Sequence, residues 1–169
     1  MAALVHANPQ RVQLVRRETT TNALVTAVLA ALISWLLFRG RTGIPAIGGG
    51  TDGIFGIIPG TFNFTLLVTL VLTLVTRGRV RRGAPNRLPA QGLLARALPD
   101  NVLLRSLMLA FLLTLTLVSL TYAAGLTAIR TGVLPPTWSF AGLLLFYVVY
   151  FVALALIVTP IVIWRALSD

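Results

Sequence analysis

Few side chains in this sequence are suited to chemistry. The 169 residues include no cysteine, four acidic residues and a single histidine, His6. Proton transfer and covalent catalysis need a base beside an acid or nucleophile, and metal sites need grouped His, Cys or carboxylate ligands. Haem also usually needs an axial histidine. The sequence therefore predicts no enzyme activity, cofactor or metal.

Coupled transport is not predicted either. Proton- and sodium-coupled transporters commonly hold an ionisable side chain near the middle of the membrane. The four apolar stretches of this chain contain no Asp, Glu or Lys. Arg105 lies near the start of the third stretch, and we expect its long side chain to reach the cytoplasmic lipid headgroups.

Threonine hydroxyls are polar groups with a regular spacing here. The second apolar stretch carries one at every fourth position: Thr61, Thr65, Thr69 and Thr73. A helix would place them on one stripe. The stripe can pack against another helix, or it can line a polar path with Asn63, Thr114 and Thr121. We favour packing, because helical threonine usually bonds its own backbone.

Alanine follows the same spacing in the first apolar stretch, at Ala23, Ala27 and Ala31, with Ser34 nearby. Small residues on one stripe let two helix backbones approach closely, which is a main route to helix association in lipid. We predict that these alanines also lie at a helix–helix contact.

The composition indicates the elements that carry these residues. Hydrophobic residues make up 57% of the chain and charged residues 11%, with a mean hydropathy of +0.90. The apolar residues are concentrated in stretches 22–38, 54–76, 102–126 and 138–164. A helix needs about 20 residues to cross the hydrocarbon, and the first stretch qualifies when 19–21 are included. The sequence predicts an all-α membrane protein with four transmembrane helices.

The arginines indicate the orientation. Eleven of the 14 lie before the first stretch, between the second and third, at the start of the third, or after the fourth. Arg39, Arg41 and Arg130 lie on the other side. The positive-inside rule then places both termini and the central loop in the cytoplasm of a bacterial cell, with the helices in its inner membrane.

Contacts with membrane lipids account for the net charge of +10. Arginines beside helix ends contact anionic lipid headgroups, for about 1 kcal/mol each. We assign this role to Arg77, Arg79, Arg81 and Arg82. Trp35, Trp138 and Trp164 are expected to anchor helix ends at the membrane surface. The chain has no basic domain with interleaved aromatic residues, so nucleic-acid binding is not expected.

These assignments divide the chain into segments. A cytoplasmic tail covers 1–18. A first transmembrane hairpin covers 19–76 and contains a glycine-rich outer loop at 39–53. A basic cytoplasmic loop at 77–100 is expected to include an interfacial helix. A second hairpin covers 101–164, and 165–169 form a second cytoplasmic tail.

The two hairpins share a motif. GIIPGTFNF at 56–64 and GVLPPTWSF at 132–140 match in order and in residue type, except that Gly60 corresponds to Pro136. Common requirements of helix starts could produce this likeness, but nine aligned positions favour duplication of one hairpin. Both hairpins begin in the cytoplasm, so they would be parallel repeats. We predict that Pro59 and Pro135 mark helix starts and that Thr61 and Thr137 open the helices.

In layout the chain resembles small uncharacterised bacterial inner-membrane proteins built from one or two such hairpins. The resemblance brings no activity and no functional residue. Two function classes follow from the residues themselves. One is a non-catalytic accessory or scaffold subunit of a larger membrane complex, or a homo-oligomer, in which helix packing is the role. The other is an uncoupled channel or small permease formed when the duplicated hairpin oligomerises.

Overall fold

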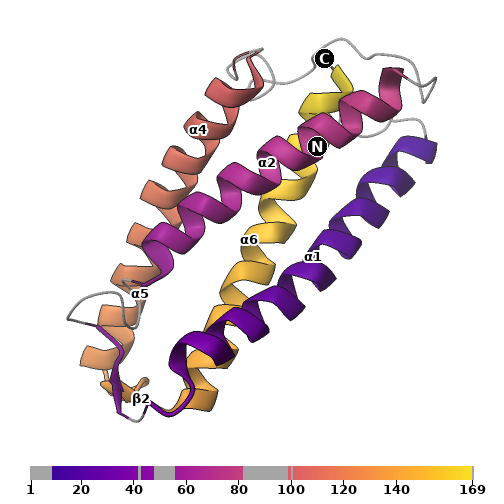
Figure 1. Ribbon diagram of the computed structural model, residues 1–169. Helices are drawn as coiled ribbons and strands as arrows, with labels where there is room; N and C mark the ends of the chain where they lie inside the picture. Colours follow the sequence, from indigo (N-terminus) through magenta and orange to yellow (C-terminus); the bar gives the residue numbers. More distant parts are fainter. Residues whose placement is uncertain (1–8, 42, 48–55, 82–98, 100, 169) are drawn as a thin grey trace.

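The computed structural model describes residues 9–41, 43–47, 56–81, 99 and 101–168, and these are nearly all helical (Figure 1). The elements in chain order are α1 (Pro9–Phe38), β1 (Ile44–Pro45), α2 (Ile57–Arg81), α4 (Val102–Leu113), the π-helical turn η3 (Thr114–Val118), α5 (Ser119–Arg130), β2 (Thr137–Trp138) and α6 (Phe140–Ser168). The segments α4, η3 and α5 follow one another without a break and form one long helix.

Four helices are long and apolar enough to cross a membrane, which confirms this part of the prediction. The candidate spans are Val12–Phe38, Ile57–Gly78, Val102–Arg130 and Phe140–Ala166. The chain is therefore a multi-pass membrane protein. The first helix is longer than its apolar stretch, because it begins at Pro9 and continues through the arginines that precede the span.

The helices pack in the spatial order α1, α6, α2, α4. Helix α1 packs against α6, and α2 packs against both α6 and α4 (Figure 1). Each of these extensive contacts joins the first half of the chain to the second. Within the described residues, the two helices of each predicted hairpin are thus not each other's main partners.

The contact between α1 and α6 is lined by small and polar side chains. Thr26, Ala30 and Ser34 are buried on α1, and Ala155 and Thr159 are buried on α6. Small side chains allow the two backbones to approach closely.

A hydrogen bond of 2.7 Å strengthens this contact, because the Asn22 amide nitrogen donates to the Thr159 hydroxyl. The predicted stripe of Ala23, Ala27 and Ala31 lies one position away from the buried residues of α1 and is half-buried.

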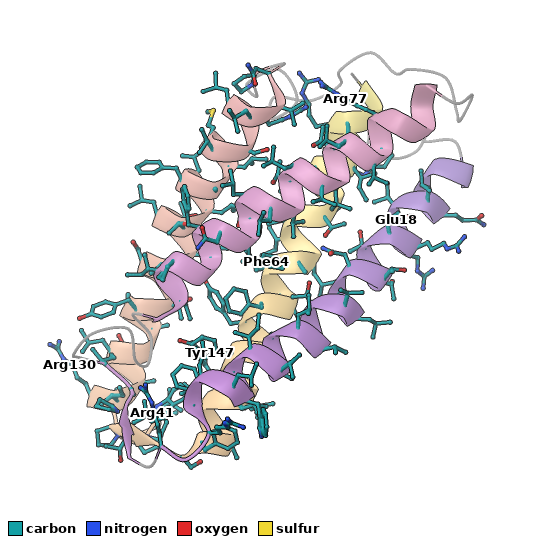
Figure 2. The ribbon with its side chains drawn as sticks, in the orientation of Figure 1. Glu18, Arg41, Phe64, Arg77, Arg130 and Tyr147 are labelled. Carbon is teal, nitrogen blue, oxygen red and sulfur yellow. The ribbon has the colours of Figure 1, made fainter. Side chains whose placement is uncertain are left out.

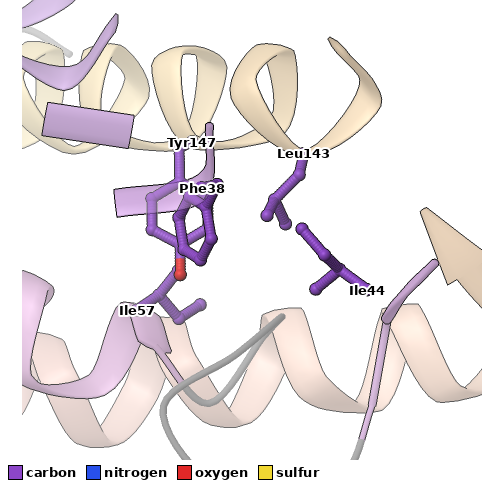
Figure 3. Close-up of a cluster of buried hydrophobic side chains, with 5 residues drawn as sticks. All are labelled: Phe38, Ile44, Ile57, Leu143 and Tyr147. Atoms are coloured by element: carbon purple, nitrogen blue, oxygen red, sulfur yellow. The ribbon is translucent and has the colours of Figure 1, made fainter. Parts of the chain in front are cut away.

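The end of the molecule that carries β1 and β2 is held together across the chain. Ile44 pairs with Trp138 and Pro45 with Thr137 in a short antiparallel ladder. Next to the ladder lies a cluster of buried hydrophobic side chains from α1, β1, α2 and α6: Phe38, Ile44, Ile57, Leu143 and Tyr147 (Figure 3). The segment that follows α1 and the segment that precedes α6 are therefore packed against each other.

The two copies of the repeated motif have different conformations. In the first copy, α2 begins at Ile57, and Pro59 lies in its first turn as predicted. In the second copy, Pro135 lies outside any helix and Thr137 lies in β2, while α6 begins only at Phe140. The prediction that Pro135 and Thr137 mark a helix start is wrong.

The single unlike position of the motif explains the difference. Pro136 stands where the first copy has Gly60, and a residue that precedes proline is disfavoured in the helical region. Two consecutive prolines therefore keep Pro135 out of a helix. The chain starts α6 later, and the Ser139 hydroxyl oxygen accepts a hydrogen bond of 3.2 Å from the Gly142 backbone N–H.

Candidate functional site

The threonine row on α2 is the most regular polar feature of the interior. Thr61, Thr65, Thr69 and Thr73 are each 0% exposed. Because α2 packs against α6 and α4, the row lies inside the helix group and not on a lipid-facing surface. Thr76, which the sequence analysis did not include, continues the buried row by a further turn.

The first threonine of the row is bonded to two partners. The Thr61 hydroxyl donates to the Ile57 backbone oxygen at 2.6 Å, and its oxygen lies 2.8 Å from the Tyr150 hydroxyl of α6. A threonine oxygen can donate one hydrogen bond and accept another. The donor to Ile57 can thus also accept from Tyr150, and this pair ties α2 to α6.

The next three threonines behave differently. The hydroxyls of Thr65, Thr69 and Thr73 make no hydrogen bond within the described part of the chain. The expectation that helical threonine returns its hydroxyl to the backbone is correct for Thr61 and Thr116 but not for these three. Burying a hydroxyl without a hydrogen-bond partner costs about 1–3 kcal/mol of free energy relative to leaving it in water.

The side chains beside the row are apolar. Phe64, Val68 and Leu72 each precede one of the three threonines, and they pack against a buried cluster formed by Leu109 of α4 with Leu154, Val158 and Val162 of α6. Phe64 lies about two turns after the start of α2 (Figure 2). The row therefore has a hydrophobic environment along most of its length.

Gly60 brings α2 and α6 close together next to the row. A Cβ atom added at Gly60 would lie 2.7 Å from Cζ of Phe151. The Phe151 ring also packs against Phe64, Tyr147 and Tyr150, with centroid distances of 5.7, 6.1 and 5.4 Å. This aromatic group fills the space at the β1–β2 end of the row.

Arg105 and Ser106 are buried on α4, near the opposite end. Arg105 is 1% exposed, and the Ser106 hydroxyl donates to the Val102 backbone oxygen at 2.7 Å. The expectation that Arg105 reaches the lipid headgroups is wrong, because protein encloses its side chain. Leu109 and Ala110 lie one turn later on the same buried face of α4, but its exposed faces are also apolar, so the sequence did not mark this face as buried.

Of the other polar residues of the predicted path, Asn63 does not join the row. Asn63 is exposed, and at 100° per residue it lies on the side of α2 opposite Thr65. Thr114 and Thr121 are half-buried on the third span, and Thr114 lies in the π-helical turn η3, which the sequence analysis missed. Such turns frequently occur at functional sites.

The predicted anchors lie at both ends of the helices. Trp35 is exposed, and the Arg39 guanidinium lies 5.0 Å from the centre of its ring. Trp138 packs edge-on against Phe146, and Trp164 packs against Val15 and Ile163.

The arginines assigned to lipid headgroups lie at the end of α2. Arg77 is half-buried, Arg79 and Arg81 lie in the last turn of α2, and Arg82 lies outside the described residues. Arg41 and Arg130 lie at one end of the molecule and Arg77 at the other (Figure 2).

The described residues contain no group of three or more His, Cys, Asp or Glu side chains placed to hold a metal ion. What they bring together is a buried threonine row, one tyrosine and an aromatic cluster. A comparison of the chain with known protein families, with curated proteins and with solved structures finds no match.

Proposed function

We propose that the protein is a non-catalytic membrane protein whose role is helix packing, as an accessory or scaffold subunit of a larger membrane complex or as a homo-oligomer. The observation that carries this proposal is the complete burial of the threonine row. Four hydroxyl-bearing side chains with 0% exposure have no space for water beside them. A packing seam needs such contact, whereas a conducting path needs room for its solute.

The proposal also includes the membrane, the orientation of the helices and the origin of the two halves. The helices lie in a bacterial inner membrane with both termini and the basic loop on the cytoplasmic side, supported by the arginine distribution. The two halves arose by duplication of one hairpin as parallel repeats, supported by the shared motif. The arginines at the cytoplasmic ends contact anionic headgroups.

The native mass of the protein in mild detergent and in nanodiscs tests the main proposal. We expect a discrete homo-oligomer, or co-purification at fixed stoichiometry with another membrane protein. A monodisperse monomer that supports solute flux in liposomes would contradict it.

A second candidate is an uncoupled channel or permease. It is favoured by the three buried hydroxyls of Thr65, Thr69 and Thr73 that have no partner in the described part of the chain. A small movement of α4 away from α2 would give them polar solutes or water as partners. In this case the triple change to valine would abolish flux in liposomes and leave the folded state intact. Flux that persists in the valine variant would exclude the row as the path.

A further inference from the structure

The exposed side of α2 carries one polar side chain within its span. Asn63 is exposed, and its amide makes no hydrogen bond to any residue that the structure describes. The span begins at Ile57, so Asn63 lies about 9 Å along the helix axis, inside a hydrocarbon layer of about 30 Å. In lipid, such an amide has no water to bond, so a protein partner would stabilise it.

The residues around Asn63 form a surface suited to helix packing. Pro59, Asn63, Leu67 and Val71 recur at every fourth position and are all exposed, with Leu67 at 59% and Val71 at 55%. They lie on one side of α2, while Gly60, Phe64 and Val68 face α6. We call this set the Asn63 stripe.

We infer that the Asn63 stripe is the contact between two copies of this chain, with the two Asn63 amides hydrogen-bonded to each other. Copies inserted with the same orientation place Asn63 at the same depth, so each meets its own equivalent across a two-fold axis along the membrane normal. A carboxamide has both donors and an acceptor and is complementary to itself. This inference deepens the proposed function and rests on its homo-oligomer form.

Disulfide cross-linking in the membrane tests the contact, because the natural chain has no cysteine. Leu67→Cys, one turn from Asn63, should form a covalent dimer on oxidation. Leu120→Cys, 67% exposed on the third span, should not. Dimers through Leu120→Cys but not Leu67→Cys would overturn the inference.

The role of the amide is tested by substitution in the Leu67→Cys chain. Asn63→Val should weaken association by about 3- to 30-fold, the range measured for hydrogen bonds between membrane helices. Asn63→Gln should retain association. The matched control is Thr116→Val, because Thr116 is also exposed within a span but donates its hydroxyl to the Leu112 backbone oxygen at 2.8 Å. This control should leave association unchanged.

The outcomes separate this inference from the proposed function. If the native mass stays oligomeric after Asn63→Val with unchanged cross-linking, the Asn63 contact is wrong and the packing role stands. If the unaltered protein is a monomer in nanodiscs, the contact is also wrong. Thermal unfolding of each variant shows whether a loss of dimer reflects a loss of fold, and we expect equal stability for Asn63→Val because the side chain is exposed.

Discussion

The threonines that recur at every fourth position of α2 differ in the hydrogen bonds of their hydroxyls. Thr61 bonds Ile57 and Tyr150, whereas Thr65 is equally buried and its hydroxyl bonds no described residue. Spacing in the sequence predicts that both lie on one stripe, but it does not contain the position of Tyr150 on a helix 89 residues away. The shared face was thus predictable from the sequence, and the difference between the two hydroxyls was not.

This difference gives opposite expectations for two matched substitutions. Thr61→Val should lower the free energy of unfolding by about 1–2 kcal/mol, because it removes a hydrogen bond and leaves the Tyr150 hydroxyl without that partner. Thr65→Val should be neutral or stabilising, because it replaces an unbonded buried hydroxyl with a methyl group of similar size. Unfolding in mixed micelles measures both. Equal destabilisation by the two changes would contradict the assigned bonding.

We expect the stability of the protein to be sensitive to a single methyl group added at Gly60. Gly60→Ala would place a Cβ atom 2.7 Å from the Phe151 ring, which other aromatic rings hold in place. We expect a loss of about 1–3 kcal/mol, the usual range for overpacking. Phe151→Leu in the same chain should restore part of the loss, and strictly additive effects of the two changes would argue against direct contact.

At the scale of elements, the sequence predicts the helices better than their partners. Long apolar stretches indicate four spans, since length and composition alone decide whether a helix can cross a membrane. Pairing is harder to predict, because all four surfaces are apolar and the decisive features are small: Asn22 opposite Thr159, and Gly60 opposite Phe151. The repeat also suggested like conformations, but one proline in place of a glycine changed the start of α6.

The pairing of β1 with β2 can be tested by a designed disulfide. Pro45 and Thr137 are direct partners in the ladder and both are exposed, so their Cα atoms lie within reach of a disulfide. Pro45→Cys with Thr137→Cys should cross-link rapidly within one chain. Pro45→Cys with Thr131→Cys, an exposed residue outside the ladder, is the control and should react slowly. Equal rates would contradict the ladder.

At the scale of the whole molecule, the arginines distinguish the two ends of the helices. The structure places Arg41 and Arg130 at one end and Arg77 at the other (Figure 2), as spans that cross the membrane in alternate directions require. The arginine count predicts the orientation by the positive-inside rule. This argument comes from the sequence alone.

Thiol labelling of intact cells tests the orientation. Val133 is 75% exposed at the end that carries β2, so Val133→Cys should react with an impermeant reagent added outside. Ala84→Cys, in the basic loop of the sequence, should react only after the cells are opened. The reverse pattern would invert the topology and leave the fold unchanged.

The helices of the first half of the chain pack mainly against helices of the second half, and this has a consequence for synthesis of the protein. Helix α1 is made first, but its packing partner α6 is made last, after about 100 further residues. At ~5–20 residues per second, α1 waits in the bilayer for about 5–20 s before its partner emerges from the ribosome. During that interval the Asn22 amide lacks Thr159, and insertion chaperones or membrane proteases have time to bind the nascent chain. A messenger truncated before α6 would thus produce an unpaired helix suited to degradation.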